Sequence, residues 1–364
     1  MPRAQLAREK NIKSLLGVVI SGRFRIVECV GGGSFGDVFM GVNIYSGTRV
    51  AVKVEPSKRH GQVLTEYRTY RTLNECALAV GIPQVYFGGK VGDYNVVVMD
   101  LLGPNLEQVF NLCGRKFGVK TVCMIGIQIF QRMQSMHCMN YIHRDIKPEN
   151  FVLGVRENSQ IVYVIDLGLA KRYRDPRTLQ HIPWESNKSL AGTVRYMSIN
   201  THRGIAQTRR DDLESVMYLL FYFLRGGLPW QGMKHQANDH NYEGICDMKV
   251  HITPHTLAEG YPRQFATLLE YTRSLRFEET PSYSFCLQLL NDVLAARGET
   301  FDYQYSWLEN LGLRLTEEAN DEETVEDEPP PAPASSTARS KHRSASTNAT
   351  HYQGTSYKGY EEDT

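Results

Sequence analysis

The sequence lacks a long apolar segment, an excess of charge of either sign and any close pairing of cysteines. No apolar run approaches the roughly 20 residues that cross a bilayer, and the N-terminal region does not resemble a secretory signal peptide. The 41 Lys and Arg residues balance 40 Asp and Glu residues, so the net charge of +1 indicates neither nucleic acid nor a membrane surface as a partner. We therefore expect no membrane span, and the cytoplasm, the nucleus or both as the location.

The cysteines are scattered singly, which is unlike a disulfide framework or a zinc site. They are Cys29, Cys76, Cys113, Cys123, Cys138, Cys246 and Cys286. Hydrophobic residues make up 41% of the chain and charged residues 22%, which is usual for a globular protein. A chain of 364 residues is longer than one domain of roughly 100–200 residues, so we expect two packed lobes or one domain plus a tail.

One short charged stretch, His143–Asn150 (HRDIKPEN), has the spacing of a phosphoryl-transfer site. Asp145 can accept a proton from an attacking hydroxyl, and Asn150, five positions later, can hold a metal ion. Charged loops that begin His-Arg-Asp also arise by chance. The interpretation therefore depends on partners upstream and downstream.

A glycine-rich turn lies upstream between two β-rich segments. Its pattern, Gly31-x-Gly33-x-x-Gly36-x-Val38, lets backbone N–H groups approach nucleotide phosphates closely. A dinucleotide site is disfavoured because a β-rich segment, and not a helix, follows the glycines. A plain glycine-rich hairpin is the other interpretation.

A predicted strand, Val50–Glu55, puts Ala51 and Lys53 on one face. Lys53 can hold nucleotide phosphates there, and the small Ala51 leaves room for a purine ring. Thirteen residues later, Glu66 lies in an amphipathic helix predicted over 62–70. A lone strand Lys is often solvated and a helix Glu is usually at the surface. The order of glycine turn, Lys and Glu favours an ion pair between them.

The chain is predicted to pass from a β-rich part into a helical part at Asp100–Pro104, after a pair of strands over 85–87 and 94–99. Backbone groups of such a crossing can hydrogen-bond an adenine edge. A helix buried on most sides is predicted over 119–139, and it leads to His143.

A buried strand predicted over 161–165 ends at Asp166, directly before a glycine turn. A carboxylate in that position suits Mg²⁺, which takes one or two carboxylates together with phosphate oxygens. Asp166 and Asn150 would share the ion. An ordinary turn also fits Asp-x-Gly, but its position after Asn150 favours the metal.

These five motifs, in this order, resemble the protein-kinase signature set, and from about Phe24 to Leu313 the sequence resembles the casein kinase 1 family. Several segments carry the family resemblance: Ser198–Asn200, where most kinases have Ala-Pro-Glu, Arg209–Ser215, Leu228–Gly232, Arg273–Phe277 and Pro281–Tyr283. The resemblance implies a bilobal α+β kinase fold over residues 21–315. An antiparallel sheet with one helix would form the N-lobe (21–99), followed by a hinge (100–104) and a mainly helical C-lobe (105–315).

The resemblance also implies an active, monomeric serine/threonine kinase that uses ATP and Mg²⁺ without activating phosphorylation. Asp145 would be the catalytic base, Lys147 would stabilise charge on the transferring phosphoryl group, and Asn150 and Asp166 would bind Mg²⁺. The implied ATP-binding residues are Val30, Gly31, Gly32, Gly33, Ser34, Phe35, Gly36, Asp37, Val38, Ala51, Lys53, Glu66, Met99, Asp100, Leu102 and Val152.

Members of this family prefer Ser or Thr preceded, three residues N-terminally, by a phosphorylated residue or by acids, so we expect protein substrates of that kind. Lys171 and Arg195 match basic family positions that favour a phosphate dianion. The third such position is Asn241, in a run over 234–241 that has lost nearly all its charge. This loss predicts a weaker advantage for pre-phosphorylated substrates and less nuclear accumulation.

Some positions depart from the family pattern. Leu167 replaces the usual Phe after Asp166, and Val194 resembles the tau-tubulin kinases, which are related enzymes, whereas Glu214–Ser215 favours casein kinase 1 proper. A tau-tubulin-like kinase is therefore the nearer alternative. A catalytically dead pseudokinase scaffold would need a lost lysine, catalytic acid or metal ligand, and all are present.

The two ends of the chain differ from its middle. Residues 1–20 are predicted to form a loosely packed arm. Residues 316–364 are predicted to be a disordered tail, first acidic and then basic and rich in Ser and Thr. Thr324 follows three acids, and Ser344, Thr347 and Thr350 recur every third residue. A solvated tail is one interpretation, and a tail that inhibits the kinase after autophosphorylation is the other hypothesis.

Overall fold

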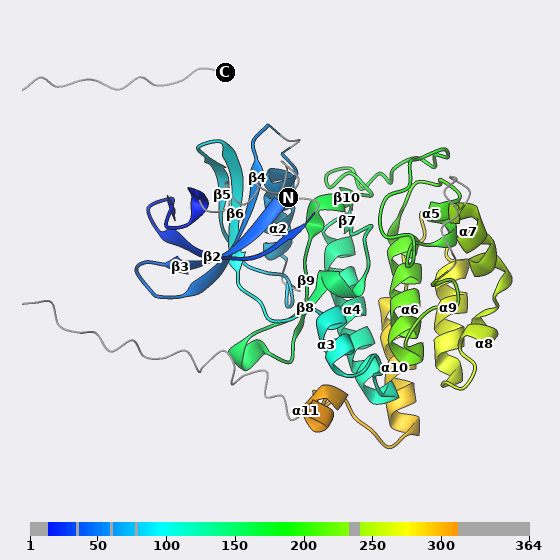
Figure 1. Cartoon of the computed structure of the whole chain (residues 1–364). Helices are drawn as coiled ribbons and strands as arrows, with labels where there is room; N and C mark the ends of the chain where they lie inside the picture. Colours follow the sequence, from blue (N-terminus) through cyan, green and yellow to red (C-terminus); the bar gives the residue numbers. More distant parts are fainter. Residues whose placement is uncertain (1–13, 34–35, 59–60, 77–78, 233–240, 312–364) are drawn as a thin grey trace, which may run out of the picture. The chain divides into compact units, whose positions relative to one another are not determined.

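The computed structural model describes residues 14–33, 36–58, 61–76, 79–232 and 241–311. An antiparallel sheet with one helix comes first, and a mainly helical part comes after it, as the sequence predicts (Figure 1). Ser34 and Phe35 of the glycine turn and the predicted tail over 316–364 lie outside the described residues, as does the side chain of Asn241. No helix in the described ranges is long and apolar enough to cross a membrane.

Six strands form one antiparallel sheet in the order β1-β2-β3-β4-β6-β5. They are β1 (Val19–Ile20), β2 (Phe24–Gly33), β3 (Gly36–Asn43), β4 (Arg49–Pro56), β5 (Val85–Val91) and β6 (Tyr94–Asp100). Side chains alternate across a strand, so Val50, Val52 and Val54 of β4 enter a small core on one face. Ala51 and Lys53 lie on the opposite face, as predicted.

The first strand begins within the predicted N-terminal arm. Val19 pairs with Arg25 and Ile20 with Phe24. Ile20 is only 1% exposed because it joins the small core beside Phe24 and Ile26. The expectation of loose packing through residue 20 is therefore wrong for Ile20, whereas Val19 pairs with β2 but stays exposed.

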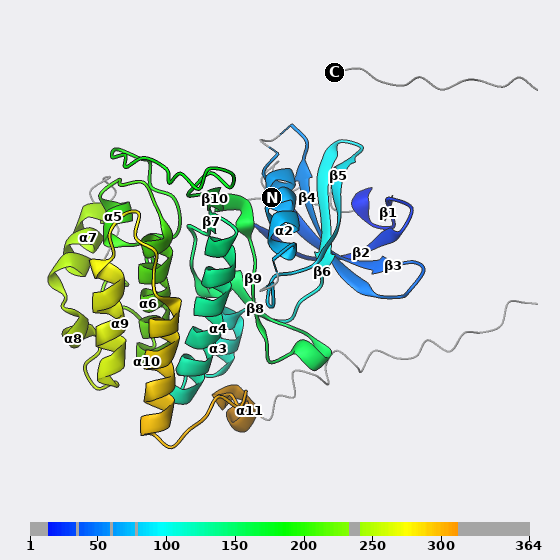
Figure 2. The same cartoon turned by 180° about the vertical axis from the view of Figure 1, so that it is seen from behind.

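One helix, α2 (Gln62–Asn74), packs against β4, β5 and β6 (Figure 2). Its buried side chains, including Val63 and Tyr70, join Val97 and Met99 of β6 in the larger of two cores. That core continues into the helical part, so α2 links the sheet to the other helices. It extends the predicted helix of 62–70 by about one turn.

The helical part is built around two long buried helices, α4 and α6. Its helices are α3 (Leu106–Leu112), α4 (Val119–Cys138), α5 (Ile199–His202), α6 (Arg209–Arg225), α7 (Asn241–His251), α8 (Pro254–Leu257), α9 (Arg263–Ser274), α10 (Tyr283–Ala296) and α11 (Ser306–Leu311). The buried helix predicted over 119–139 is confirmed as α4. Helix α6 begins after Thr208, whose backbone N–H donates to the Asp211 carboxylate at 2.7 Å, and ends at Gly226, whose φ of 81° suits glycine.

The segment between α4 and α5 contains short paired strands and 3₁₀ turns. They are β7 (Tyr141–Ile142), η1 (Pro148–Asn150), β8 (Phe151–Leu153), η2 (Arg156–Asn158), β9 (Val162–Val164), η3 (Leu167–Leu169) and β10 (Lys171–Arg172). Strand β7 pairs with β10 and β8 pairs with β9. These pairings fold His143–Asn150 and Asp166 back toward the sheet.

Candidate active site

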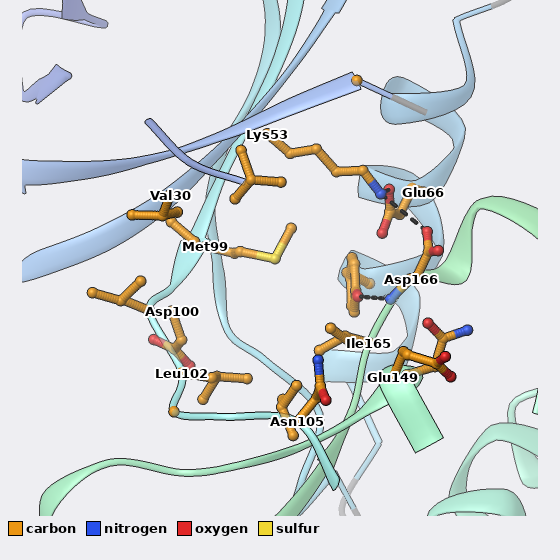
Figure 3. A pocket seen from close by; sticks show the side chains of 18 of the residues that line it. Val30, Lys53, Glu66, Met99, Asp100, Leu102, Asn105, Glu149, Ile165 and Asp166 are labelled. Carbon is orange, nitrogen blue, oxygen red and sulfur yellow. Dashed lines mark hydrogen bonds and ion pairs between the residues drawn. The ribbon is translucent and has the colours of Figure 1, made fainter. Parts of the chain in front are cut away.

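A pocket of about 780 Å³ is lined by the sheet, by the segment after β6 and by the loops around η1 and η3 (Figure 3). Most of the residues implied in ATP binding line it: Val30, Gly32, Gly36, Val38, Ala51, Lys53, Glu66, Met99, Asp100, Leu102 and Val152. Gly31 and Asp37 are not among the lining residues, because they alternate with them along β2 and β3 and so belong to the other face.

Lys53 connects three separate elements at one end of the pocket. Its Nζ lies 2.7 Å from Oε2 of Glu66 on α2 and 3.0 Å from Oδ1 of Asp166 after β9 (Figure 3). Burial works to lower the pKa of Lys53, but the two carboxylates outweigh it and hold that pKa above its ordinary value. The predicted pair of Lys53 and Glu66 is confirmed, and Lys53 stays charged at neutral pH.

Asp166 adopts a left-handed backbone conformation with φ 62°. The Asp166 backbone N–H donates a hydrogen bond to the hydroxyl of the buried Tyr70 at 3.0 Å. The Leu167 backbone N–H donates to Glu66 Oε1 at 3.2 Å. Non-glycine residues in this conformation cluster at functional sites, where surrounding contacts maintain them. Helix α2 thus fixes the turn that carries Asp166.

The carboxylate of Asp145, in the loop before η1, has three hydrogen-bond donors. Its carboxylate accepts hydrogen bonds from Lys147 Nζ at 2.6 Å, from Thr193 Oγ1 at 2.7 Å and from Asn150 Nδ2 at 3.3 Å. Burial works to raise the pKa of Asp145, but the bonds from Lys147 and Thr193 prevail and hold that pKa below its ordinary value. Asp145 is therefore an ionised carboxylate at neutral pH.

The backbone of the loop that carries Asp145 is held by Asp212 of α6. The Asp212 carboxylate accepts hydrogen bonds from His143 N at 2.8 Å and Arg144 N at 2.9 Å. His137 Nε2 lies 2.9 Å from the same carboxylate, and the Tyr283 hydroxyl lies 2.6 Å from His137 Nδ1. Burial lowers the pKa of His137, so a neutral ring donates through Nε2 and accepts through Nδ1.

Gly192 brings the following segment against this loop. Its φ is 103°, and a Cβ at this position would lie 2.3 Å from the Arg144 carbonyl oxygen. Only glycine combines this backbone conformation with such a close approach. As a result Thr193 is within hydrogen-bond distance of Asp145.

The donor set fits a nucleotide with a hard metal ion. Val30, Ala51 and Val152 supply apolar lining, and Lys53 supplies a permanent cation. Asn150 Nδ2 also donates to the Asp145 carbonyl at 2.8 Å, which leaves the amide oxygen as the potential metal ligand. Within the described ranges no three or more His, Cys, Asp or Glu side chains gather as a metal cluster. Such a cluster is not needed by Mg²⁺ that also binds phosphate oxygens.

The two residues expected to recognise substrate phosphate lie in different surroundings. Exposed Lys171 lines a second cavity of about 220 Å³ together with Arg144 and Lys188. Arg195 is not among the residues that line it, and its guanidinium lies 5.7 Å from the ring centroid of Tyr196. Lys171 therefore lies at the second cavity, whereas Arg195 lies beside an aromatic ring.

Several residues of the site were not predicted. Asn105, Glu149 and Ile165 also line the pocket, while Thr193 and Asp212 position Asp145 or its loop. Asp212 lies in Arg209–Ser215, which carries the family resemblance, and Thr193 is next to Val194, where the sequence departs from the family pattern. These two positions could have pointed to the missed residues.

Comparison with protein families gives one result. Residues 24–297 match the family model described as the protein kinase domain. The match covers more than half of the chain and contains every residue that lines the pocket.

Proposed function

The chain belongs to the protein kinase family, and we propose that it is a serine/threonine kinase of the casein kinase 1 type that acts on acidic or pre-phosphorylated proteins. The observation that carries the proposal is the ionised carboxylate of Asp145, bonded to both Lys147 and Thr193 near a pocket that holds Lys53, Glu66 and Asp166. Family membership implies phosphorylation of proteins. The acceptor type and substrate preference are the further steps of the proposal.

Asp145 would act as the base. Its depressed pKa keeps the carboxylate free to take the proton of a Ser or Thr hydroxyl while the hydroxyl oxygen bonds to the γ-phosphorus and the bond to the ADP oxygen breaks. Lys147, 2.6 Å from that carboxylate, would stabilise negative charge on the transferring group.

The pocket residues would hold ATP without taking part in bond making. Lys53, fixed by Glu66, would bind the phosphates, and the backbone of Asp100 and Leu102 would bind the adenine edge. Bound Mg²⁺ would neutralise charge on the phosphates, and Asn150 and Asp166 are the residues that would hold it. Positioning of this kind lowers the barrier because it removes the entropic cost of assembling the reactants.

The casein kinase 1 assignment is supported by contacts between segments that carry the resemblance. Ser198 Oγ donates to Asp211 Oδ1 at 2.6 Å, and Glu214 Oε1 accepts from Ile199 N at 3.1 Å. These bonds join α6 to the Ser-Ile-Asn segment, which stands where most kinases have Ala-Pro-Glu. Three cations around the second cavity, Arg144, Lys171 and Lys188, support the preference for acidic or phosphorylated substrates.

The direct test is Asp145→Asn in the full chain, assayed with radiolabelled ATP, Mg²⁺ and an acidic casein-like protein. Loss of the base should lower kcat by about 10³-fold, within the range that general base catalysis contributes. ATP binding, followed by thermal shift, should persist. Asp292→Asn changes a half-buried acid on α10, distant in sequence from the site, and serves as the control, with transfer expected at the wild-type rate. Ordinary turnover by Asp145→Asn would disprove the assignment of the base.

Substrate preference is tested with two peptides that differ only three residues before the acceptor, one phosphorylated there and one carrying Asp. The neutral residue at Asn241 should leave a primed-to-acidic kcat/KM ratio that is smaller than that of Asn241→Lys. Equal ratios in the two proteins would contradict the weakened-priming hypothesis. Phosphoamino acid analysis of the product decides between serine, threonine and tyrosine acceptors.

A further inference from the structure

Lys249 is a completely buried lysine outside the pocket. It lies on α7 and is 0% exposed, yet it has no carboxylate within salt-bridge distance among the ion pairs of the described residues. Its Nζ instead donates to the carbonyl oxygens of Met197 at 2.7 Å and Val194 at 2.9 Å, and it lies 3.1 Å from His202 Nε2. All three acceptors belong to one stretch, Val194–His202.

The surroundings of this ammonium group are aromatic and charged. Nζ lies 5.0 Å from the ring centroid of Tyr218 and 5.1 Å from that of Trp230. Trp230 Nε1 also donates to the Arg195 carbonyl at 2.8 Å, so α7 and the Trp230 turn hold three carbonyls of the same stretch. Glu214 and Arg273 are the nearest groups of full charge, and Arg273 Nη2 donates to the Lys249 carbonyl at 2.8 Å.

A buried ammonium group is costly, and an apolar side chain of the same length would fill the space without that cost. Burial lowers the pKa of Lys249 to about 7, with Glu214 opposing the change. Burial also lowers the pKa of His202 to about 3, so its ring is neutral and can accept at Nε2. The compensation for the buried charge is therefore the set of three hydrogen bonds to Val194–His202.

The stretch Val194–His202 held by Lys249 directly follows a residue that contacts Asp145. Thr193, its direct neighbour, bonds to Asp145, and the Thr193 carbonyl accepts from Tyr196 N and Met197 N. A hydroxyl that reaches Asp145 must come from a chain that passes close to Thr193 and Val194. Displacing the carbonyls held by Lys249 would therefore move the surface on which that chain lies.

We propose that Lys249 is a positioning residue that holds Val194–His202 as the platform for the substrate chain, and that it controls peptide recognition separately from ATP. The inference rests on the proposed kinase function, because it assigns a role in binding the acceptor. Trp230, through its bond to the Arg195 carbonyl, has the same role with one hydrogen bond where Lys249 has three.

The test compares wild type with Lys249→Met, an apolar side chain of similar length, in the full chain. The peptide KM should rise about 10-fold or more, while the ATP KM and the rate of ATP hydrolysis without peptide stay within about twofold. Lys249→Arg, which keeps the charge and the donors, should recover part of the peptide affinity. Lys120→Met removes a half-buried lysine paired with Asp302 and is the control, with no change expected.

Trp230→Phe is the second variant, in case Lys249→Met folds poorly. It keeps an aromatic ring but loses the Nε1–H donor and part of the buried indole volume, so the peptide KM should rise a few-fold with an unchanged ATP KM. Wild-type peptide KM in both variants, or equal losses toward ATP and peptide, would overturn the inference.

Hydrogen exchange separates this inference from the proposed function. The amides of 194–202 should exchange faster in Lys249→Met than in wild type or Lys120→Met, whether or not transfer is observed. Absence of transfer in wild type would refute the kinase proposal alone, and unchanged exchange in Lys249→Met would refute the anchoring of the platform.

Discussion

Two lysines, the half-buried Lys53 and the buried Lys249, contact different halves of this site. Lys53 bonds to the carboxylates of Glu66 and Asp166, whereas Lys249 bonds to two backbone carbonyls and a neutral imidazole. Burial works to lower the pKa of both. The full negative charges outweigh burial at Lys53 and hold its pKa above the ordinary value, while burial dominates at Lys249 and its pKa falls to about 7.

The contrast shows two ways in which a lysine can hold separate segments of the chain together. Ion pairs of Lys53 with Glu66 and Asp166 join a strand, a helix and a loop. The Lys53 ammonium group in these pairs also lines the pocket as a cation. Hydrogen bonds to carbonyl oxygens hold a segment at Lys249 and leave no charge exposed. We therefore expect the first region to control ATP and the second to control the acceptor.

Of the substitutions that test this comparison, Lys53→Met should have the largest effect on kinetics. It removes the pocket cation and leaves Glu66 and Asp166 as neighbouring carboxylates, so kcat/KM for ATP should fall by about 10²-fold or more. Steady-state kinetics with varied ATP and varied peptide measure both parameters, and the peptide KM should stay within about twofold. A loss confined to the peptide KM would reverse the roles assigned to the two lysines.

Glu66→Gln should have an intermediate effect. Lys53 then keeps its ion pair with Asp166 but loses its tie to α2, so kcat/KM for ATP should fall by about 10-fold. Glu107→Gln changes the more exposed pair with Arg115 on α3 and should leave the kinetics unchanged. Similar kinetics in the two variants would show that the tie to α2 is not required.

Thr193→Val should have the smallest effect on rate but a distinct signature, because Thr193 joins the two regions. Its hydroxyl stabilises the ionised form of Asp145 and so lowers that pKa, and removing it raises the pKa. The acid limb of the kcat/KM profile should therefore move to higher pH, with a rate loss of only a few-fold at neutral pH. Thr267→Val on α9 is the control, and identical acid limbs in all three proteins would argue against Asp145 as the titrating base.

Much of the ATP half of the site could be predicted from the sequence because it depends on side-chain chemistry at short or characteristic spacing. Lys53 and Glu66 lie thirteen residues apart, and Asp145 and Lys147 lie two apart. Alternation along the strand likewise predicts that Ala51 and Lys53 share one face of β4. The same alternation, followed further, separates Gly31 and Asp37 from the residues that line the pocket.

The remaining contacts leave no comparable pattern. Lys249 and Trp230 bond to backbone carbonyls, and Asp212 bonds to backbone amides, which every residue except proline has. Their partners lie 35 to 69 residues away, so no local spacing marks them. Lys171 and Arg195 were grouped by family resemblance, which carries no information on whether two side chains share a cavity.

The bond between Asp212 and the loop of His143 and Arg144 also bears on how the protein is synthesised. Asp212 lies 69 residues after His143, so at about 5–20 residues per second it is made about 3 to 14 seconds later. During that interval the nascent chain already contains Asp145, but the amides of His143 and Arg144 have no carboxylate to hold them. We therefore expect the loop that carries Asp145 to gain these two hydrogen bonds only after α6 has been made.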